Sequence, residues 1–410
     1  MRIIDRKMLE IICGLTRRGN LTVRLPDGST RRFDGSLTGP RAEIDLHDPR
    51  AIRRLALSGP IGLADGWIAR EFDSPDLASV IELAALSIEH RPRSGLATIV
   101  DRATKAVWRS LGRATSPRGP LSTTVEHYDL GNAFFAAWLD ETMTYSSALF
   151  ARDDMTLEEA QAEKYRRIAE ATGLRPGMRV LEIGSGWGGF AVYAAETLGC
   201  HVTTVTVSKE QAAWVEQLIA ERGLDDRITV RLEDFLATSG SFDAVVSIEM
   251  IESIPASRWS EFFRVVHDRL EPGGMAGLQI ITVADRHWAS SDSNPDFSRR
   301  YVFPGSQVPS PSILMREAQA ADLGWIAATS FGRSYAATLA AWRIRFDAAW
   351  PRIADLGFDD SFKRMWQYYL AYCEGGFRSG RVDVRQIVLE RSADRHALNR
   401  RPAVSAADNR

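Results

Sequence analysis

The chain has 410 residues, of which 45% are apolar and 25% are charged, and its formal net charge is -2. This length exceeds what one hydrophobic core usually holds, so we expect two domains; the composition excludes a disordered chain, a collagen and a coiled coil. The sequence contains no run of 18 apolar residues, the length that a membrane-spanning helix needs. Its three cysteines lie far apart and form no CxxC pair, which argues against a disulfide framework or a zinc cluster. We therefore expect a cytoplasmic enzyme without a metal site.

The first part of the chain predicts a smaller domain of mixed structure. Strands are expected over residues 21–25 and 29–33, joined through Pro26-Asp27-Gly28, and helices over residues 62–72 and 77–88. The stretch at residues 114–122 is rich in Pro, Gly and Ser and predicts a linker. An N-terminal domain, which we expect to associate with lipid, would then occupy residues 1–113.

The segment before this linker is strongly basic. Residues 91–120 carry seven Lys or Arg side chains against one Asp, and apolar residues recur there at the spacing of one helical face, beside Trp108. A basic amphipathic helix of this kind fits an anionic membrane surface, which would make the enzyme peripheral on the inner face of the membrane. A helix that packs on the other domain and exposes its basic face to water explains the pattern equally well.

After the linker, strand-like and helical segments alternate. A helix with a capping box is expected to follow Thr156, because Glu159 lies three residues further on. Five apolar strands are expected, at residues 179–183, 202–207, 228–232, 244–248 and 275–281. The alternation predicts a parallel sheet wound by helices on both faces, in a domain at residues 123–392 that is followed by a disordered tail at 393–410.

The first strand of this sheet ends in a glycine-rich turn, Glu182-Ile-Gly184-Ser-Gly186-Trp-Gly188-Gly189. Glycines in such a turn let a ligand approach the backbone closely. A nicotinamide cofactor fits less well, because the second strand does not end in the acid that would hold its ribose. Glu182 would repel a pyrophosphate but attract the ammonium and sulfonium groups of S-adenosylmethionine (SAM), so the pattern favours SAM.

Further motifs resemble one family of enzymes. They are His127-Tyr-Asp-Leu-Gly-Asn132, Thr144-Tyr-Ser146, Leu181-Glu-Ile-Gly-Ser-Gly-Trp-Gly188, Ser247-Ile-Glu-Met-Ile-Glu252, Tyr301-Val-Phe-Pro-Gly305, Tyr335-Ala-Ala-Thr-Leu-Ala-Ala-Trp342 and Phe362-Lys-Arg-Met-Trp-Gln-Tyr-Tyr-Leu370. The set is similar to that of the cyclopropane-fatty-acyl-phospholipid synthases and mycolic acid methyltransferases. The resemblance implies a class I SAM-dependent methyltransferase fold, an α/β fold with a doubly wound seven-stranded sheet, and an added smaller N-terminal domain. It also implies methyl transfer to a cis double bond in the acyl chain of an unsaturated phospholipid.

The same resemblance implies which residues hold the cofactor. Tyr145 and Ser146 would contact the methionine part of the cofactor. The glycine loop would contribute Gly184, Gly186 and Gly188. The residues near the ribose and adenine would be Thr206, Val207, Gln211, Asp234 and Phe235. Phe235 could stack on the purine, or it could be a core aromatic residue.

Methyl transfer to a double bond creates a carbocation, which must lose a proton in a dry pocket. In cyclopropane-forming relatives a bicarbonate ion is thought to take this proton, held by a cysteine, a glutamate, a histidine and a tyrosine. The matching positions here are Ser147, Glu252, Gln279 and Tyr335, so two of the four side chains differ. If Ser147 and Gln279 still hold bicarbonate, a cyclopropane forms. If they move the base, the proton leaves a neighbouring chain carbon and a methyl-branched, shifted alkene forms; this is the product we favour, and it puts the bicarbonate site in doubt.

Other functions use the same features. A small-molecule methyltransferase would share the cofactor loop without an apolar tunnel for an acyl chain. A lipid-binding protein without catalytic activity would have lost the chemistry together with the changes at Ser147 and Gln279. Nucleic acid is disfavoured as a partner by the near-neutral charge, and a homodimer is compatible with the sequence.

Overall fold

The structure is a computed structural model that describes residues 1–89, 130–288 and 297–393. The basic segment, the linker and nearly all of the tail lie outside these residues, so the expectations about them stay predictions. The chain forms two compact units. The first comprises Met1–Leu139, Arg286–Ser306 and Gly332–Asp383, and the second comprises Asp140–Asp285, Gln307–Phe331 and Val384–Arg410.

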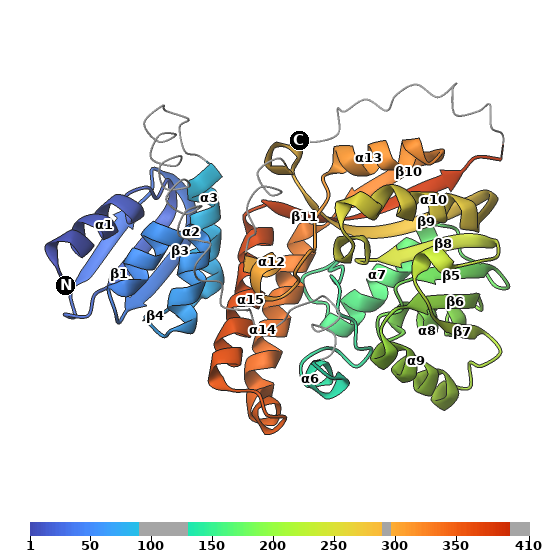
Figure 1. Cartoon of the computed structure of the whole chain (residues 1–410), viewed down its shortest axis with the longest axis horizontal. Helices are drawn as coiled ribbons and strands as arrows, with labels where there is room; N and C mark the ends of the chain where they lie inside the picture. Colours follow the sequence, from blue (N-terminus) through green and yellow to red (C-terminus); the bar gives the residue numbers. More distant parts are fainter. Residues whose placement is uncertain (90–129, 289–296, 394–410) are drawn as a thin grey trace. The chain divides into compact units, whose positions relative to one another are not determined.

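The first unit contains a four-stranded sheet with the order β2-β1-β3-β4 (Figure 1). Its strands are β1 (Arg18–Arg24), β2 (Thr30–Asp34), β3 (Leu37–Leu46) and β4 (Phe72–Asp73). The antiparallel pairing of β1 with β2, with Leu21 opposite Phe33, confirms the expected strand pair. Side chains along β1 are alternately buried and more open, and helix α3 (Leu77–Glu89) packs on β1 and β3.

The helix expected over residues 62–72 has different bounds in the structure. Helix α2 (Arg50–Ile68) begins earlier and is kinked at Gly59, and the chain has already entered β4 at Phe72. Gly59 has a φ of 55°, a left-handed conformation that glycine adopts at little cost, and Pro60 follows it.

The remaining helices of the first unit are α1 (Ile3–Cys13), α6 (Asn132–Ala136), α12 (Phe297–Tyr301), α14 (Gly332–Asp355) and α15 (Asp360–Arg378). Helices α14 and α15 pack on one another. The buried ring of Trp138 lies 5.7 Å from the Trp342 ring and 6.0 Å from the Trp366 ring, measured between ring centroids. These rings form an aromatic core that the hydrophobic effect stabilises. Among the described residues, no helix is both long and apolar enough to cross a membrane.

The second unit contains a seven-stranded sheet with the order β10-β11-β9-β8-β5-β6-β7 (Figure 1). The strands are β5 (Arg179–Ile183), β6 (His201–Thr206), β7 (Ile228–Leu232), β8 (Phe242–Ile248), β9 (Leu270–Val283), β10 (Leu323–Ser330) and β11 (Val382–Arg391). Strand β5 is parallel to both β6 and β8, and β10 is antiparallel to β11. All five strands that were located in the sequence are present, and the sheet has the seven strands that the resemblance implies; the positions of β10 and β11 were not predicted.

The helices of this unit are α7 (Leu157–Ala171), α8 (Gly189–Glu196), α9 (Lys209–Arg222), α10 (Trp259–Arg269) and α13 (Pro311–Ala320), with single 3-10 turns η1 (Phe235–Ala237), η2 (Ile251–Ser253) and η3 (Ala256–Arg258). The predicted capping box at the start of α7 is confirmed: the Thr156 hydroxyl accepts from the backbone N of Glu159, whose carboxylate accepts from the backbone N of Thr156. Buried Val180, Val202 and Val246 of the parallel strands pack with Phe190 of α8 in the core.

Candidate active site

The chain runs from β5 to β6 on one side and later crosses to β8 on the other side of β5. In open α/β sheets, ligands bind at such a switch point, beyond the carboxyl ends of the strands. Most of the expected cofactor and proton-transfer residues lie in the second unit, on the loops and turns that follow β5, β6, β7 and β8; Gln211 lies on α9, Gln279 lies within β9, and Tyr335 belongs to the first unit.

The glycine loop leaves β5 at this point. Gly184, Gly186 and Gly188 have φ angles of 95°, 49° and 90°, which side chains other than glycine rarely adopt. A Cβ atom at Gly184 would lie 3.1 Å from Cγ of Met250, whereas a Cβ atom at Gly186 would meet nothing within 4 Å. The loop is therefore packed closely at Gly184 and open at Gly186, as expected of a turn that a ligand approaches.

Glu182 lies within β5, two residues before Gly184. It is paired in register with Thr204 of β6, whose hydroxyl donates to Glu182 Oε2 at 2.6 Å. Burial raises the pKa of Glu182 to about 8, although the hydrogen bond from Thr204 acts in the opposite direction. A cation bound at the loop would favour the ionised carboxylate, which fits the expected attraction between Glu182 and SAM.

The end of β6 presents an apolar side chain beside a polar pair. Thr206 donates its hydroxyl to Oε1 of Gln211 at 2.9 Å, and the backbone N of Ser208 donates to the same hydroxyl. Val207, between them, is 62% exposed. An exposed valine next to fixed polar groups suits an adenosine moiety, which has an apolar ring face and polar edges.

Asp234 and Phe235 follow β7. Asp234 accepts from the backbone N of Leu236, which caps η1, and forms an ion pair with Arg258 at 3.1 Å. The Phe235 ring is buried, lies 5.9 Å from the Phe262 ring, and carries the Arg258 guanidinium over its face at 4.8 Å. Phe235 thus packs as a core aromatic residue, and Arg258, which the sequence did not single out, organises this corner.

Tyr145 is half-buried and Ser146 is buried, on the segment before α7. The Nζ atom of buried Lys164 donates to Ser146 Oγ at 2.8 Å, and Gln161 Nε2 donates to the Ser146 carbonyl at 3.0 Å. Burial lowers the pKa of Lys164 to about 7, while the charges of Glu249 and Asp140 act to raise it. The family motifs did not indicate a buried lysine with such a low pKa at this position.

The structure brings Ser147 and Gln279 together through a third residue, Glu249. Oε1 of Glu249 accepts from the backbone N of Ser147 at 2.9 Å and from Gln279 Nε2 at 2.8 Å. The same Nε2 donates to the Ser147 carbonyl at 3.2 Å, and Gln279 Oε1 accepts from Gln386 at 3.1 Å. The Ser147 hydroxyl donates to the Ala148 carbonyl at 2.8 Å.

Glu252 lies on η2 and is buried. Its Oε1 accepts from the backbone N of Ile281, while its Oε2 has no hydrogen-bond partner among the described residues. Burial raises the pKa of Glu252 to about 8, and the charge of Glu249 adds to this shift. Glu252 is therefore largely protonated near pH 7.

Tyr335 lies on α14 of the first unit. Its buried ring lies 4.4 Å from the Phe377 ring at an interplanar angle of 33°. The structure therefore groups Ser147, Glu252 and Gln279 in one unit and gives Tyr335 an aromatic environment in the other.

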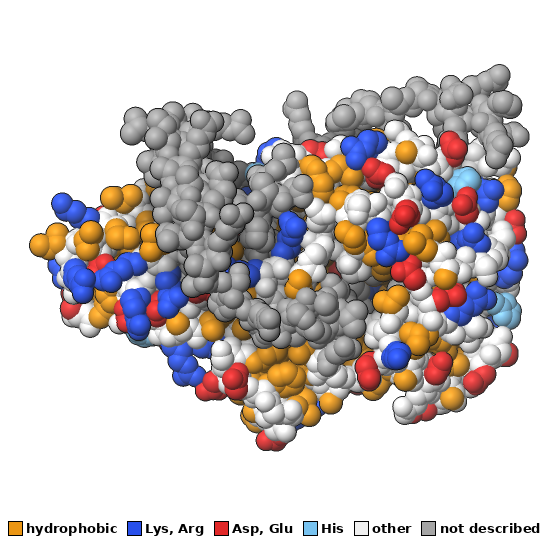
Figure 2. Space-filling model, in the orientation of Figure 1, with side chains coloured by type: hydrophobic (Ala, Val, Ile, Leu, Met, Phe, Trp, Pro, Cys, Tyr) orange, Lys and Arg blue, Asp and Glu red, His pale blue; other side chains and the backbone are white. Residues whose placement is uncertain are grey.

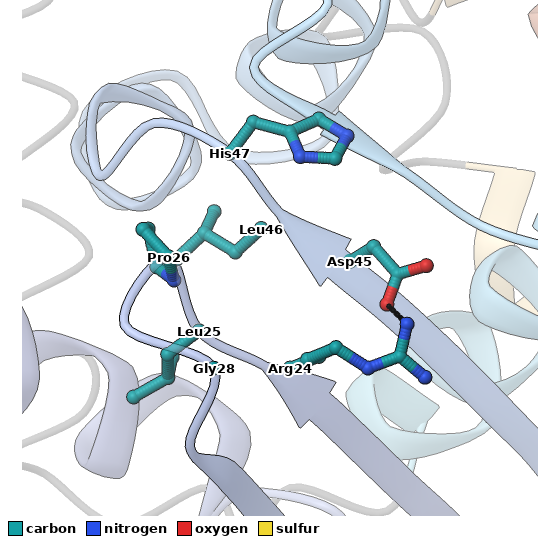
Figure 3. A pocket seen from close by; sticks show the side chains of 7 residues that line it. All are labelled: Arg24, Leu25, Pro26, Gly28, Asp45, Leu46 and His47. Carbon is teal, nitrogen blue, oxygen red and sulfur yellow. Dashed lines mark ion pairs between the residues drawn. The ribbon is translucent and has the colours of Figure 1, made fainter.

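A separate hollow of about 400 Å³ lies on the sheet of the first unit (Figure 3). Arg24 and Asp45, which point toward each other there, form an ion pair at 2.8 Å. None of the predicted site residues lines this hollow, and its main charges neutralise one another, so it is a poor candidate for chemistry.

The donor set beyond the sheet fits SAM. Backbone is open at Gly186, an apolar side chain is exposed at Val207, and carboxyl groups at Glu182 and Asp234 can face cationic or amino groups. Together with the strand order, these features define a class I SAM-dependent methyltransferase.

Comparison with known proteins gives the family. The model of the mycolic acid cyclopropane synthetase family matches residues 116–387. The tuberculostearic acid methyltransferase UfaA1 of Mycobacterium tuberculosis is 36% identical over 375 residues, which cover 87% of this chain and 86% of that protein. The cyclopropane-fatty-acyl-phospholipid synthase of Escherichia coli K12 is 35% identical over 366 residues, covering 86% and 89%. The crystal structure of the mycolic acid cyclopropane synthase CmaA1 complexed with S-adenosylhomocysteine (SAH) and CTAB is similar with a TM-score of 0.61 and 32% identity, covering 65% of this chain and 96% of that one.

The chain belongs to the mycolic acid cyclopropane synthetase family and is a SAM-dependent methyltransferase that acts on lipids. The expected fold class and cofactor are confirmed. Sequence reasoning missed Glu249, Lys164 and Gln386. Glu249 did carry a signal, because a charged residue directly after a buried parallel strand points to the ligand edge of the sheet.

Proposed function

We propose that this enzyme methylates a cis double bond in the acyl chain of an unsaturated phospholipid and releases a methyl-branched alkene with a shifted double bond. When bound, SAM supplies an electrophilic methyl group. The chain's task is to hold the acyl chain in line with that group, to exclude water, and to remove one proton from the resulting carbocation.

The proposed cofactor residues divide this work by position. The glycine loop, with Gly184, Gly186 and Gly188, leaves room for the cofactor beside its backbone. Glu182 attracts the positively charged groups of the cofactor from within the sheet. The methionine part of the cofactor faces Tyr145 and Ser146. Thr206, Val207 and Gln211 would hold the ribose and adenine, with Asp234 at the far edge. Phe235 supports this corner from the core rather than by exposed stacking.

The observation that carries the proposed product is the hydrogen bonding of Gln279. The amide nitrogen of Gln279 donates to Glu249 and to the Ser147 carbonyl, and its amide oxygen accepts from Gln386. A bicarbonate ion would therefore have to displace Glu249 to accept a hydrogen bond from the Gln279 nitrogen. A different proton acceptor takes the proton from a different carbon. Ser147 and Gln279 then act as positioning residues, and Glu252 and Tyr335 complete the proposed catalytic set.

The decisive experiment uses purified enzyme, vesicles containing a cis-monounsaturated phospholipid, and SAM with a labelled methyl group. Mass spectrometry of the released fatty acids should show one labelled carbon in a product that keeps one double bond. A labelled product whose double bond has become a three-membered ring would contradict the branched product and leave methyl transfer to lipid intact.

A cyclopropane product is the second candidate, and one observation favours it. The carboxyl group of Glu252 accepts a hydrogen bond from the backbone N of Ile281. These are two of the groups that the resemblance assigns to the bicarbonate site, and they lie together. In that case bicarbonate should stimulate the wild-type enzyme.

We further propose that the N-terminal domain brings the enzyme to the inner face of an anionic membrane. Helix α1 buries Asp5, Leu9 and Cys13 on one face. Its other face exposes Ile4 and Ile11, at 63% and 68%, together with Lys7. Figure 2 shows hydrophobic and basic side chains side by side around this end of the first unit. Such a surface can insert apolar groups at a bilayer interface while its cations contact anionic lipid.

A further inference from the structure

Glu249 occupies an unusual backbone position. It is the first residue after β8, and its φ of 52° lies in the left-handed region that residues with a Cβ atom rarely adopt. Its backbone N donates to the Gln279 carbonyl at 2.8 Å, so the main chain is fixed to β9 at this point. Strain of this kind persists where the surrounding structure holds it and is concentrated at functional sites.

The side chain of Glu249 is aimed by two donors. Ser147 N and Gln279 Nε2 both donate to Oε1, and Gln279 is itself fixed by Gln386. Ser147 and Gln279 are fully buried, whereas Glu249 is only half-buried. Hydrogen bonds to one oxygen therefore orient a carboxylate that is not sealed inside the protein.

The surrounding charges separate the roles of two neighbouring carboxyl groups. Glu249 is half-buried, and its Oε1 accepts hydrogen bonds from Ser147 N and Gln279 Nε2. Glu252, whose Oε2 has no partner among the described residues, is held in the protonated form by burial and by the charge of Glu249. A protonated Glu252 cannot accept a further proton, which leaves Glu249 as the neighbouring carboxyl group that can.

We propose that Glu249 is a further catalytic residue: its carboxylate accepts the proton that the carbocation loses. The inference rests on the proposed function. A C–H bond on the chain carbon next to the cationic carbon breaks, its electron pair becomes the π bond of the shifted double bond between these two carbons, and the proton moves to the carboxylate, which becomes a carboxylic acid. No oxidant or reductant is needed. Gln279 and Ser147 are positioning residues for this carboxylate.

The test compares Glu249→Gly with Glu249→Gln. Glycine fits a φ of 52° without strain, so Glu249→Gly should keep the loop while removing the carboxylate. Methylation of phospholipid should fall on the order of 100-fold or more in both variants. Added formate should restore a substantial part of the rate in Glu249→Gly, because the donors of Ser147 and Gln279 can then hold a small carboxylate. Glu249→Gln retains the bulk of the side chain and should not be rescued.

Two binding measurements keep the result interpretable. SAH titrated calorimetrically should bind all three proteins with the same affinity, which reports an intact fold and cofactor site. Carbon-13 formate should bind Glu249→Gly and not the wild type, as seen by line broadening in NMR spectra. Near-normal turnover by Glu249→Gly, or equal formate binding by both proteins, would overturn the inference. A wild-type enzyme that binds SAH and methylates no lipid would instead overturn the proposed function, and the formate titration would still decide for or against a carboxylate site at Glu249.

Discussion

At the scale of single residues, Gly186 gives the sharpest test of the cofactor site. Its φ of 49° disfavours any residue with a Cβ atom. The space beside its Cα atom is open, so a bound cofactor can fill it, and a branched side chain would then occupy the same space. We expect Gly186→Val to weaken SAH binding on the order of tenfold or more, measured by calorimetric titration.

Gly223 provides the matched control. It ends α9 with a φ of 64°, and a Cβ atom there would also meet nothing within 4 Å. Gly223→Val should therefore cost a similar stability, about 1–2 kcal/mol, without changing the affinity for SAH. Unchanged SAH affinity in Gly186→Val would remove the glycine loop from the cofactor site.

The product should respond to the two residues that differ from the family pattern. Ser147→Cys combined with Gln279→His removes the amide that donates to Glu249. We expect this double variant to shift the product toward the cyclopropane and to make the rate respond to added bicarbonate. Lipid mass spectrometry of each variant checks this, with the single variants as controls. A wild-type enzyme that already makes only cyclopropane, with bicarbonate stimulation, would refute the branched product.

The sequence predicted the site unevenly at this scale. Glycine spacing and the acid before it identify the cofactor loop, because those positions are adjacent in the chain. The hydrogen bonds of Gln279 could not be predicted, since its partners Glu249, Ser147 and Gln386 are brought together only by the order of the strands. A family motif likewise could not show that Phe235 is covered by Arg258.

At the scale of elements, buried parallel strands were the most predictable. The bounds expected for β5 and β7 agree with the structure. Strand β5 has a parallel neighbour on each side and four of its five residues are buried, so its short, mainly apolar run was easy to recognise. Strand β10 was missed for the opposite reason: most of its side chains from Ala327 to Ser330 are exposed. Strand β3 was missed because its pattern of burial is irregular.

The basic segment predicts one experiment at this scale. Neutralising four cations there should weaken binding to anionic vesicles by at most about 1 kcal/mol per charge and leave methylation of a micellar substrate intact. The changes are Arg102→Gln, Lys105→Gln, Arg109→Gln and Arg113→Gln, and vesicle co-sedimentation measures the binding.

Four exposed arginines of the second unit give an equal change of net charge. The control variant carries Arg175→Gln, Arg222→Gln, Arg264→Gln and Arg316→Gln. It should bind vesicles as the wild type does. Equal vesicle binding by all three proteins would leave the basic segment with a structural role only.

At the scale of the whole molecule, the two units are interleaved in the sequence. Residues 286–306 and 332–383 belong to the same compact unit as the N-terminal sheet. Arg364 of α15 donates to the carbonyls of Trp67 and Phe72, and Trp67 Nε1 donates to the carbonyl of Arg364. A boundary read from composition at residues 114–122 marks a change along the chain, whereas packing joins segments on both sides of it.

Stability against unfolding should depend on pH through Glu252. Its pKa is about 8 in the folded protein and near 4.5 when the carboxyl group is in water, so the folded state binds the proton more tightly. The stabilising contribution is present below pH 4.5 and is lost as the pH rises through about 8. Relative to Glu252→Gln, which does not titrate, the wild type should lose on the order of a few kcal/mol between pH 5 and pH 9 in denaturant unfolding. A constant difference across this range would show that Glu252 is not buried as described.

The Glu252→Gln variant should also lose on the order of 100-fold in methylation rate.

The left-handed backbone at Glu249 has a consequence for how such enzymes can diverge. The conformation suits glycine better than glutamate, so exchanging the two residues there asks nothing new of the main chain. Two of the four glycine codons differ from a glutamate codon by a single nucleotide transition. A lineage could therefore gain or lose an internal carboxylate in one step, without passing through a poorly folded intermediate. Dependence on a dissolved anion would then be a trait that switches readily among close relatives, while the fold and the cofactor loop stay the same.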